Sequence, residues 1–270
     1  MPNSVELVSD CSRCFALCCT ALPFVQSRDF AVSKPAGVPC QHLSRHLDCT
    51  IHDELDSRGF PGCISFECFG SGQHVSQVTF GGKSWQNDAS HSRAMFLVFA
   101  VVQQLHEMLW YLEEIAQRGP EVFRARATDC TQTILRATHS GADELLMLNV
   151  DAVRTEVSGL LHDFVEQVAL NYPQACDLRR ADAAGKDLRS KELRGARCRG
   201  ALLIGADLRG CDLTDADVLG ADFRGARVCE TDLSGSLFLT QAQLNAARGD
   251  AATRLPERLQ RPVHWSMSGM

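Results

Sequence analysis

The most regular pattern of hydrophobic and polar positions in this chain is a five-residue repeat that runs from Cys176 to Thr240. Thirteen units follow one another without a gap. Their first residue is mostly small, with Lys186 and Lys191 as early exceptions, the fourth is often arginine and the fifth often glycine. The third residue of every unit is apolar, at Leu178, Ala183, Leu188, Leu193, Cys198, Leu203, Leu208, Leu213, Val218, Phe223, Val228, Leu233 and Phe238.

A period of five residues fits neither of the regular secondary structures. The periods of a helix and of a strand would each scatter the third-position residues over all faces. A chain that turns a corner every five residues would instead point each of them inward. Such a coil buries its core only against its neighbours, so both ends need a cap. The helical segment before the repeats and residues 241–248 are the expected caps.

These units resemble the pentapeptide-repeat family, whose consensus is A-(D/N)-L-x-x. The resemblance implies a right-handed quadrilateral β-helix with about four units per coil, so thirteen units would make a little over three coils. Leu178, Cys198, Val218 and Phe238 would then stack along one face. Cys198 and Cys211 are expected to be small apolar core residues rather than ligands, because a free cysteine packs as a small hydrophobe.

Before the repeats, apolar residues recur at the three- and four-residue spacing that is typical of amphipathic helices. Gly119-Pro120 and Ser140-Gly141 interrupt the pattern. Three helices are predicted, from Asp88 or Ser90 to about residue 117, from 120 to about 138, and from 140 to about 170. His106 is expected to be a polar residue on the first of these amphipathic helices, without a catalytic role.

The N-terminal part is marked by its cysteines, since eight of the thirteen in the chain lie between residues 11 and 68. Two thiolates in a C-x2-C turn can reach one cation, and two such pieces brought together make a four-coordinate site. Soft thiolates select zinc or an iron–sulfur cluster over calcium or magnesium. The eight candidate metal ligands would fill two sites, or one site with reserve thiols: Cys11, Cys14, Cys18, Cys19, Cys40, Cys49, Cys63 and Cys68.

This segment resembles the YkgJ-type zinc- or iron-chelating cysteine-cluster family. That family has a C-x2-C-x2-C-C start, a C-x2-(F/L) step, a C-x-I-(Y/H) step and an Arg-Pro stretch ending in Cys. One extra residue stands between Cys14 and Cys18 here, and Arg-Gly-Phe-Pro at 58–61 replaces Arg-Pro. The resemblance implies chelation of zinc or iron. His42 and His52 follow cysteines closely and are candidate nitrogen ligands, although the family accepts tyrosine at the position of His52.

The expected cellular compartment helps to choose between metal binding and disulfide formation as the role of the cysteines. Residues 1–10 contain no Lys or Arg, and the most apolar run, 94–102, is shorter than the roughly 20 residues of a bilayer span. A cytoplasmic location without a membrane anchor is therefore expected, where disulfides are rare. A secreted disulfide knot, a thioredoxin-like pair at Cys11 and Cys14, and inert buried cysteines are weaker alternatives. Residues 70–72 are expected to form an exposed turn between two short strands.

Charge limits the choice of partners. The formal charge of the chain is −6, so general binding to nucleic acid or to a membrane surface is not expected. Some members of the pentapeptide-repeat family resemble DNA and bind DNA gyrase, which requires an acidic surface. Residues 176–240 carry eleven basic and eleven acidic residues, and this neutral balance argues against such mimicry. A protein partner on the solenoid faces is expected instead, and a homodimer is left open.

The sequence thus predicts an α+β multidomain protein with no catalytic residues. Its parts are a Cys-rich metal-binding module at 1–87, a helical hairpin region at 88–171, the quadrilateral β-helix at 172–245 and a C-terminal tail at 246–270. The favoured function is a non-catalytic zinc or iron protein whose solenoid has a structural or protein-interaction role. The alternatives are an iron or iron–sulfur redox protein or enzyme, and a gyrase-interacting repeat protein.

Overall fold

The computed structural model describes residues 5–87 and 89–267, and the chain divides into two units. The first unit comprises Met1–Cys63 and Glu67–Leu161, and the second comprises Ile64–Phe66 and His162–Met270. Apart from Ile64–Phe66, the cysteine-rich segment and the helical region up to Leu161 therefore belong to one unit, whereas the sequence suggested a boundary at 87/88. The reason is packing, because the long helix α4 contacts the short N-terminal helices α1 and α3.

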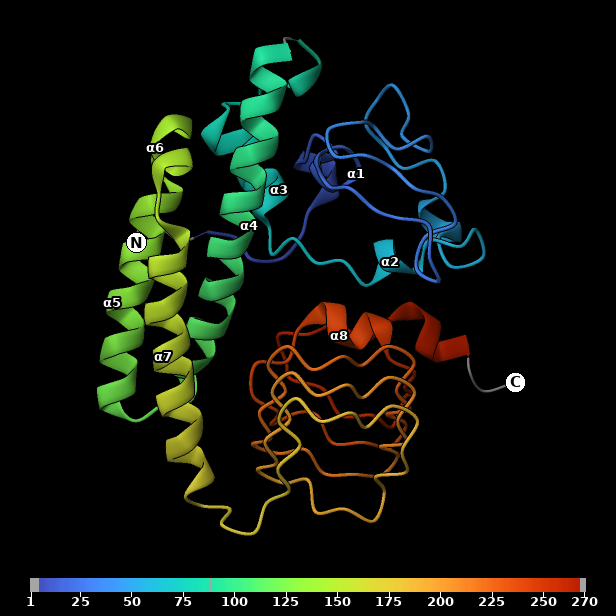
Figure 1. Ribbon diagram of the computed structural model, residues 1–270, viewed down its shortest axis with the longest axis vertical. Helices are drawn as coiled ribbons and strands as arrows, with labels where there is room; N and C mark the ends of the chain where they lie inside the picture. Colours follow the sequence, from blue (N-terminus) through green and yellow to red (C-terminus); the bar gives the residue numbers. More distant parts are fainter. Residues whose placement is uncertain (1–4, 88, 268–270) are drawn as a thin grey trace. The chain divides into compact units, whose positions relative to one another are not determined.

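The N-terminal segment consists mostly of turns and short helices (Figure 1). Two antiparallel bridges, between Phe24 and Lys34 and between Leu43 and Cys49, tie its loops together. Its buried side chains are few, and Leu17 and Phe60 are among the largest. Its helices are η1 (Cys11–Arg13), α1 (Leu17–Ala21), η2 (His52–Glu54), α2 (Pro61–Ile64), α3 (Ser71–His74), η3 (Val75–Thr79) and η4 (Trp85–Asn87).

The expected exposed turn at residues 70–72 is wrong. The chain there forms the buried helix α3, which continues into η3, a single π-helical turn. Gly70 begins the helix at a left-handed φ of 72°, and its missing side chain leaves room for the carbonyl of Glu6. A sequence rich in glycine predicts a turn, but here the glycines allow a helix to lie directly against other backbone.

The middle of the chain forms α4 (Ala89–Arg118), α5 (Glu121–Thr138), α6 (Ala142–Met147) and α7 (Val150–Ala169). The predicted first and second helices are confirmed, except that Asp88 lies outside the described residues. The third predicted helix is wrong in one respect, because it breaks at Leu148 and Asn149. The Asn149 side chain accepts a hydrogen bond from the amide of Ala152 (3.0 Å) and so caps the start of a new helix.

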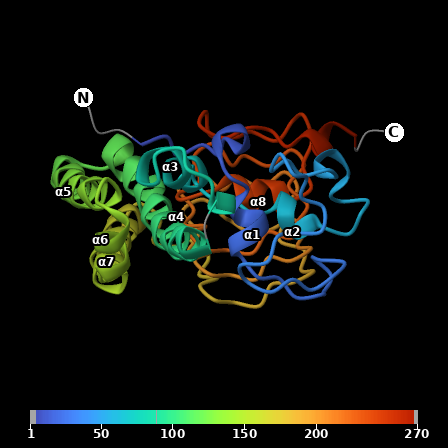
Figure 2. The ribbon, with the colours of Figure 1, turned by 90° about the horizontal axis from the view of Figure 1, so that it is seen from above.

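The helix α4 is the core of the first unit, and it packs against α5 and α6 (Figure 2). Val98, Val102, Leu105 and Leu112 recur at three- to four-residue spacing on its buried face. Its segment His91–Arg118 is long and apolar enough, by length and composition alone, to cross a membrane. However, 61% of its most apolar window is buried within the structure, as in the core helix of a folded domain.

The repeats form a stack of coils in the second unit (Figure 1). Parallel single-residue bridges join positions twenty apart, such as Asp182 with Leu202 and Leu202 with Asp222, so four units make one coil. From Ala183 to Phe238 every third-position residue is buried, and Leu178 in the first unit is half-buried. The predicted inward register and the core placement of Cys198 and Cys211 are therefore confirmed.

The C-terminal end of the stack is closed by more chain than expected. The helix α8 (Gln241–Ala246) is the predicted cap, and its Gln243 donates hydrogen bonds to the carbonyls of Val218 (2.8 Å) and Ala221 (3.0 Å). The expected tail then continues two sides of the stack through bridges at Arg248 and Arg254. The 3₁₀ helix η5 (Val263–Met267) holds the buried Trp265.

The end of α7 within the second unit contacts the coils. Glu166 pairs with Arg197 (3.2 Å) and approaches Arg179 (3.8 Å), and the Phe164 ring meets Phe238 with ring centroids 6.3 Å apart. These partners occur in the first, second and last coils, so the end of the helix contacts the side of the stack and not the first coil alone.

Candidate metal centre and repeat surface

The eight N-terminal thiols lie in one region of the first unit, and their electrostatic neighbours define two overlapping sets of four. The first set contains Cys11, Cys14, Cys18 and Cys68. A Cβ atom placed on Gly72 would lie 2.7 Å from Cys14 Sγ and 3.7 Å from Cys68 Sγ. The absent side chain of Gly72 therefore lets the backbone of α3 approach these two sulfurs.

Electrostatic effects connect the other members of the first set. Burial raises the pKa of the Cys11 thiol, and the Cys68 thiolate raises it further. Burial likewise raises the pKa of Cys14 to about 11, with Cys68 and Cys11 as charged neighbours. The Cys68 sulfur also lies 2.9 Å from Ser9 Oγ, which donates to the carboxylate of Glu67.

The second set contains Cys19, Cys40, Cys49 and Cys63. Burial raises the pKa of Cys63 to about 12, and the neighbouring thiolates of the other three members act in the same direction. The pKa of Cys49 is raised by burial and also by Cys19 and Cys40. The backbone amide of Cys40 donates to the carbonyl of Cys19 (3.0 Å), which fixes two of these segments together.

The dipeptide Cys18-Cys19 joins the two sets. Its two sulfurs lie 3.8 Å apart, and their hydrogen bond raises the pKa of Cys18. This hydrogen bond lowers the pKa of Cys19 to about 7, with a smaller contribution from the ammonium of Lys34. Cys14 and Cys11 affect Cys18, and Cys19 affects Cys11 as well as Cys49 and Cys63, so the two sets overlap at this dipeptide.

The donor atoms suit a soft divalent metal, because all eight are sulfurs of free thiols. They come from four separate segments, at residues 11–19, 40, 49 and 63–68. The sulfurs do not yet converge. Within residues 5–87 and 89–267, no three His, Cys, Asp or Glu side chains are already arranged to hold a metal ion. Binding at either set would therefore require the thiol side chains to rotate toward a common point.

The two candidate histidine ligands have other surroundings. The His42 ring packs edge-on against Phe60 with centroids 5.2 Å apart, and its Nε2 faces Gln41 (3.1 Å). His52 is mostly exposed and lies beside Asp53 (3.3 Å). The structure thus gathers the cysteines but gives neither histidine a described contact with a thiol.

A cluster of buried histidines was not expected from the sequence. His106 lies on an amphipathic helix, as expected, but it is fully buried, and its Nδ1 donates to the carbonyl of Phe69 (2.7 Å). Its Nε2 has no hydrogen-bond partner among the described residues. Burial lowers the pKa of His106 to about 3 and also lowers the pKa of His74, whose ring centroid lies 5.0 Å away. Both rings are therefore neutral core groups.

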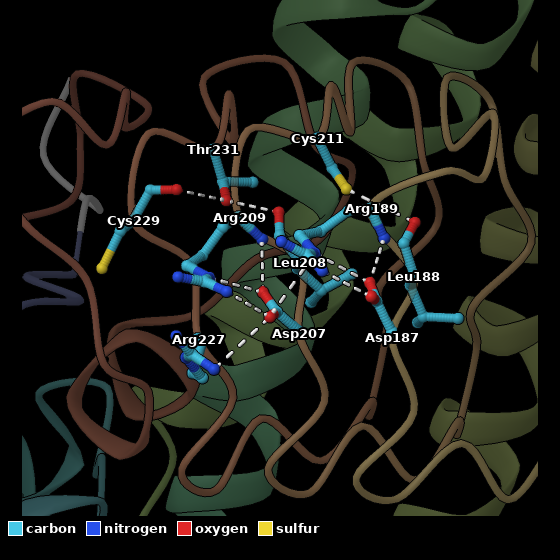
Figure 3. A network of polar contacts seen from close by, with 10 residues as sticks. All are labelled: Asp187, Leu188, Arg189, Asp207, Leu208, Arg209, Cys211, Arg227, Cys229 and Thr231. Carbon is cyan, nitrogen blue, oxygen red and sulfur yellow. Dashed lines mark hydrogen bonds and ion pairs between the residues drawn. The ribbon is translucent and has the colours of Figure 1, made fainter.

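The surface of the coils carries paired charges (Figure 3). Asp207 Oδ2 lies 2.7 Å from Arg209 Nη2, 3.4 Å from Arg227 and 3.6 Å from Arg189, while Arg189 also pairs with Asp187 (2.6 Å). Acidic second positions and basic fourth positions thus neutralise each other within a unit and between coils. The outer faces of the coils therefore carry many charged side chains, but most of these charges are compensated by a neighbour of opposite sign.

Acid should weaken these pairs. Hydrogen bonds from Arg209 hold the pKa of Asp207 well below its usual 3.8, and those from Arg189 lower that of Asp187 to about 2. A carboxyl group whose pKa is lower in the folded state stabilises the fold above its unfolded pKa and loses this effect as the pH falls. The melting temperature of the coils should therefore fall from about pH 4 to about pH 2.

Because the pairs are exposed, this fall should be small and should shrink in high salt. Circular dichroism melts of the wild type and of Asp207→Asn at several pH values would measure it. A variant with the same acid sensitivity as the wild type would contradict the role assigned to Asp207.

Comparison with known proteins identifies the family of the repeats and also a relative that is similar along nearly the whole chain. Eight copies of the family described as pentapeptide repeats match residues 192–228, which confirms the repeat predicted from the sequence. The uncharacterized protein YybG of Bacillus subtilis (strain 168) is 50% identical over 268 residues. This similarity covers 96% of the present chain and 95% of YybG, so it includes the cysteine-rich and helical parts as well as the coils.

Proposed function

The chain belongs to the same family as YybG of Bacillus subtilis, and we propose that it is a non-catalytic protein that binds zinc or iron through its N-terminal thiols and a protein partner through its pentapeptide coils. The observation that carries the metal-binding part is the gathering of eight free thiols from four separate segments of the chain. So many thiols in so small a volume exceed what packing requires, and most are only half-buried.

A structural metal would also supply what the N-terminal segment lacks. Few large side chains are buried there, and its helices have three to five residues. Small segments of this kind commonly depend on a metal for stability, because ligand binding replaces a hydrophobic core. Thirteen free thiols are compatible with the reducing cytoplasm, which is the proposed location.

The coils are suited to recognition rather than chemistry. Their inner positions are filled with apolar side chains, and their outer faces present rows of side chains at fixed spacing. The neutral, paired charges of these faces do not favour imitation of DNA. A folded protein partner fits them better than nucleic acid does.

Elemental analysis of protein purified without air tests the metal-binding part. We expect about one or two zinc ions per chain and no visible colour, because tetrathiolate zinc is colourless and each set supplies four ligands. Iron with visible absorption would assign the thiols to redox chemistry instead. Protein that carries neither metal, and takes up none when fully reduced, would refute the proposal.

A matched pair of variants controls for general effects of losing a thiol. Cys49→Ser should lower the zinc content, because it removes a ligand of the second set. Cys229→Ser should leave the content unchanged, because Cys229 lies in the coils, where its sulfur faces the carbonyl of Arg248 (3.9 Å). Equal zinc content in the two variants would place the metal elsewhere.

A further inference from the structure

The first coil of the solenoid, at residues 176–195, ends the stack with an open backbone edge opposite α8 (Figure 1). Further along, each coil is bonded to the one before it, and the amide of Leu202 donates to the carbonyl of Ala181 (2.9 Å). The matching amides of the first coil, at Asp182 and Asp187, have no hydrogen-bond partner within the described part of the chain. An edge of this kind can pair with the backbone of another chain.

A second copy of this chain offers a matching edge. Its first coil has the same sides and the same free backbone groups, so two copies can meet about a twofold axis. The opposite end of each stack is closed by α8 and by the chain around Arg248 and Arg254, which continues two of its sides. Pairing through the open edge would therefore stop at a dimer rather than extend into a fibre.

Two lysines distinguish this coil from the later ones. Every first position of a unit from 196 to 236 is buried and holds Ala, Cys, Thr or Ser. Lys186 and Lys191 are first positions as well, yet both are exposed, whereas Ala206 and Cys211, one coil later, are buried. Lysine is too long and too polar for the interior of the stack, so these two residues fit only at its open end.

Lys186 occupies a backbone group that a neighbouring coil would use. Its ammonium donates to the carbonyl of Asp182 (2.6 Å). One coil later the equivalent carbonyl, that of Leu202, accepts a hydrogen bond from the amide of Ala183 (3.0 Å). The side chain of Lys186 thus takes the place of the amide that a preceding coil would supply at this edge.

Charge is a second barrier to self-pairing. Residues 176–195 include six basic and four acidic residues, so this coil has a surplus of two positive charges. A dimer would bring two such coils together and would remove the lysine ammonium groups of both copies from water. An ion without a partner costs several kcal/mol to desolvate, and like charges also repel each other. Lysine on an open edge is a common means by which proteins prevent such pairing.

We infer that Lys186 and Lys191 keep the open edge of the first coil from pairing with a second copy of the chain. The first coil then needs no separate cap, because its own side chains protect its end. A stack of fixed length, made by one copy, is the consequence. The inference concerns self-association alone and does not depend on metal binding by the thiols.

The test replaces both lysines with the residue that is most common at first positions. Lys186→Ala/Lys191→Ala removes the two ammonium groups and suits the fold, because alanine fills most first positions of the later coils. Sedimentation velocity of the full chain gives its mass from about 1 to 100 µM, a range in which weak interfaces become populated. We expect the variant to reach twice the mass of the wild type at the upper end. The amides of Asp182 and Asp187 should then exchange hydrogen more slowly than in the wild type, because they become paired.

Two matched variants control for charge. Lys186→Arg/Lys191→Arg keeps both positive charges and should keep the wild-type mass. Arg189→Ala/Arg194→Ala removes two positive charges from exposed outer positions of the same coil and should also keep it. The inference is overturned if the double lysine variant has the wild-type mass at every concentration, or if either control associates as strongly. Association without slower exchange at Asp182 and Asp187 would overturn it as well, because the contact would then lie elsewhere.

Discussion

Replacing Phe238 with alanine should lower the free energy of unfolding of the coils by about 3–5 kcal/mol. The Phe238 side chain is fully buried at a third position in the last complete unit, and its ring meets Phe164 of α7. Alanine would leave a cavity between that helix and the stack. The coils have little freedom to close this cavity, because bridges hold their backbone every five residues. Denaturant-dependent hydrogen exchange of amides in residues 196–240 would measure the change.

Leu202→Ala is the matched control for Phe238→Ala. Leu202 lies in the same stack and bridges Asp182 and Asp222, but its side chain points outward and is 42% exposed. Its truncation should change the free energy of unfolding by less than about 0.5 kcal/mol. Similar losses in both variants would show that the inward register does not govern the stability of the coils.

The second large effect is expected at Gly70. A Cβ atom there would lie 1.9 Å from the Glu6 carbonyl oxygen, and the φ of 72° is itself unfavourable for alanine. Gly70→Ala should therefore lower the free energy of unfolding of the first unit by about 2–5 kcal/mol, from left-handed strain together with overpacking. Chemical denaturation followed by the fluorescence of Trp85 and Trp110 would report it.

Gly81→Ala separates these two contributions. Gly81 also has a positive φ, 57°, but nothing lies within 4 Å of a Cβ placed on it. Its substitution should cost only the conformational part, about 1–2 kcal/mol. Gly70→Ala should also release the contact in which Gln73 binds the carbonyl of Val8 (2.8 Å). If the two variants are equally stable, the close approach to Glu6 is not important.

The coils were the most predictable part of the fold, because their period determines both which residues face inward and which coils are neighbours. Once Leu203 is assigned to the core, the position of Phe223 one coil later follows. Residues 247–265 carry no such signal, because they continue the stack without the five-residue pattern. Their place is determined by single contacts, such as the Trp265 indole donating to the carbonyl of Ala247 (3.0 Å).

The cysteines of the candidate metal centre could be chosen from the sequence, but their neighbours could not. Cysteine spacing shows that thiols are concentrated between residues 11 and 68. It does not show which thiols become neighbours, because that depends on how the loops return after folding. The burial of Lys34 was not expected from the sequence either, since a lone lysine in a loop is usually exposed.

Local pattern was misleading where backbone must approach backbone. The glycines at 70 and 72 are typical of a turn, yet they permit the buried helix α3 to lie against Cys14 and Glu6. The amphipathic pattern does not show that the polar His106 is buried, because this depends on its contact with the carbonyl of Phe69. In both cases the deciding partner lies far away in the sequence.

The bridges between positions twenty apart imply a strict rule for how this protein can change in length. Loss of one five-residue unit would rotate every later side of the stack by a quarter turn and present a partner with the wrong row of side chains. Loss of one complete coil would shorten the stack by about 4.8 Å and leave every row in line. The rows of side chains on the outer faces therefore stay aligned only when the stack gains or loses whole coils of four units.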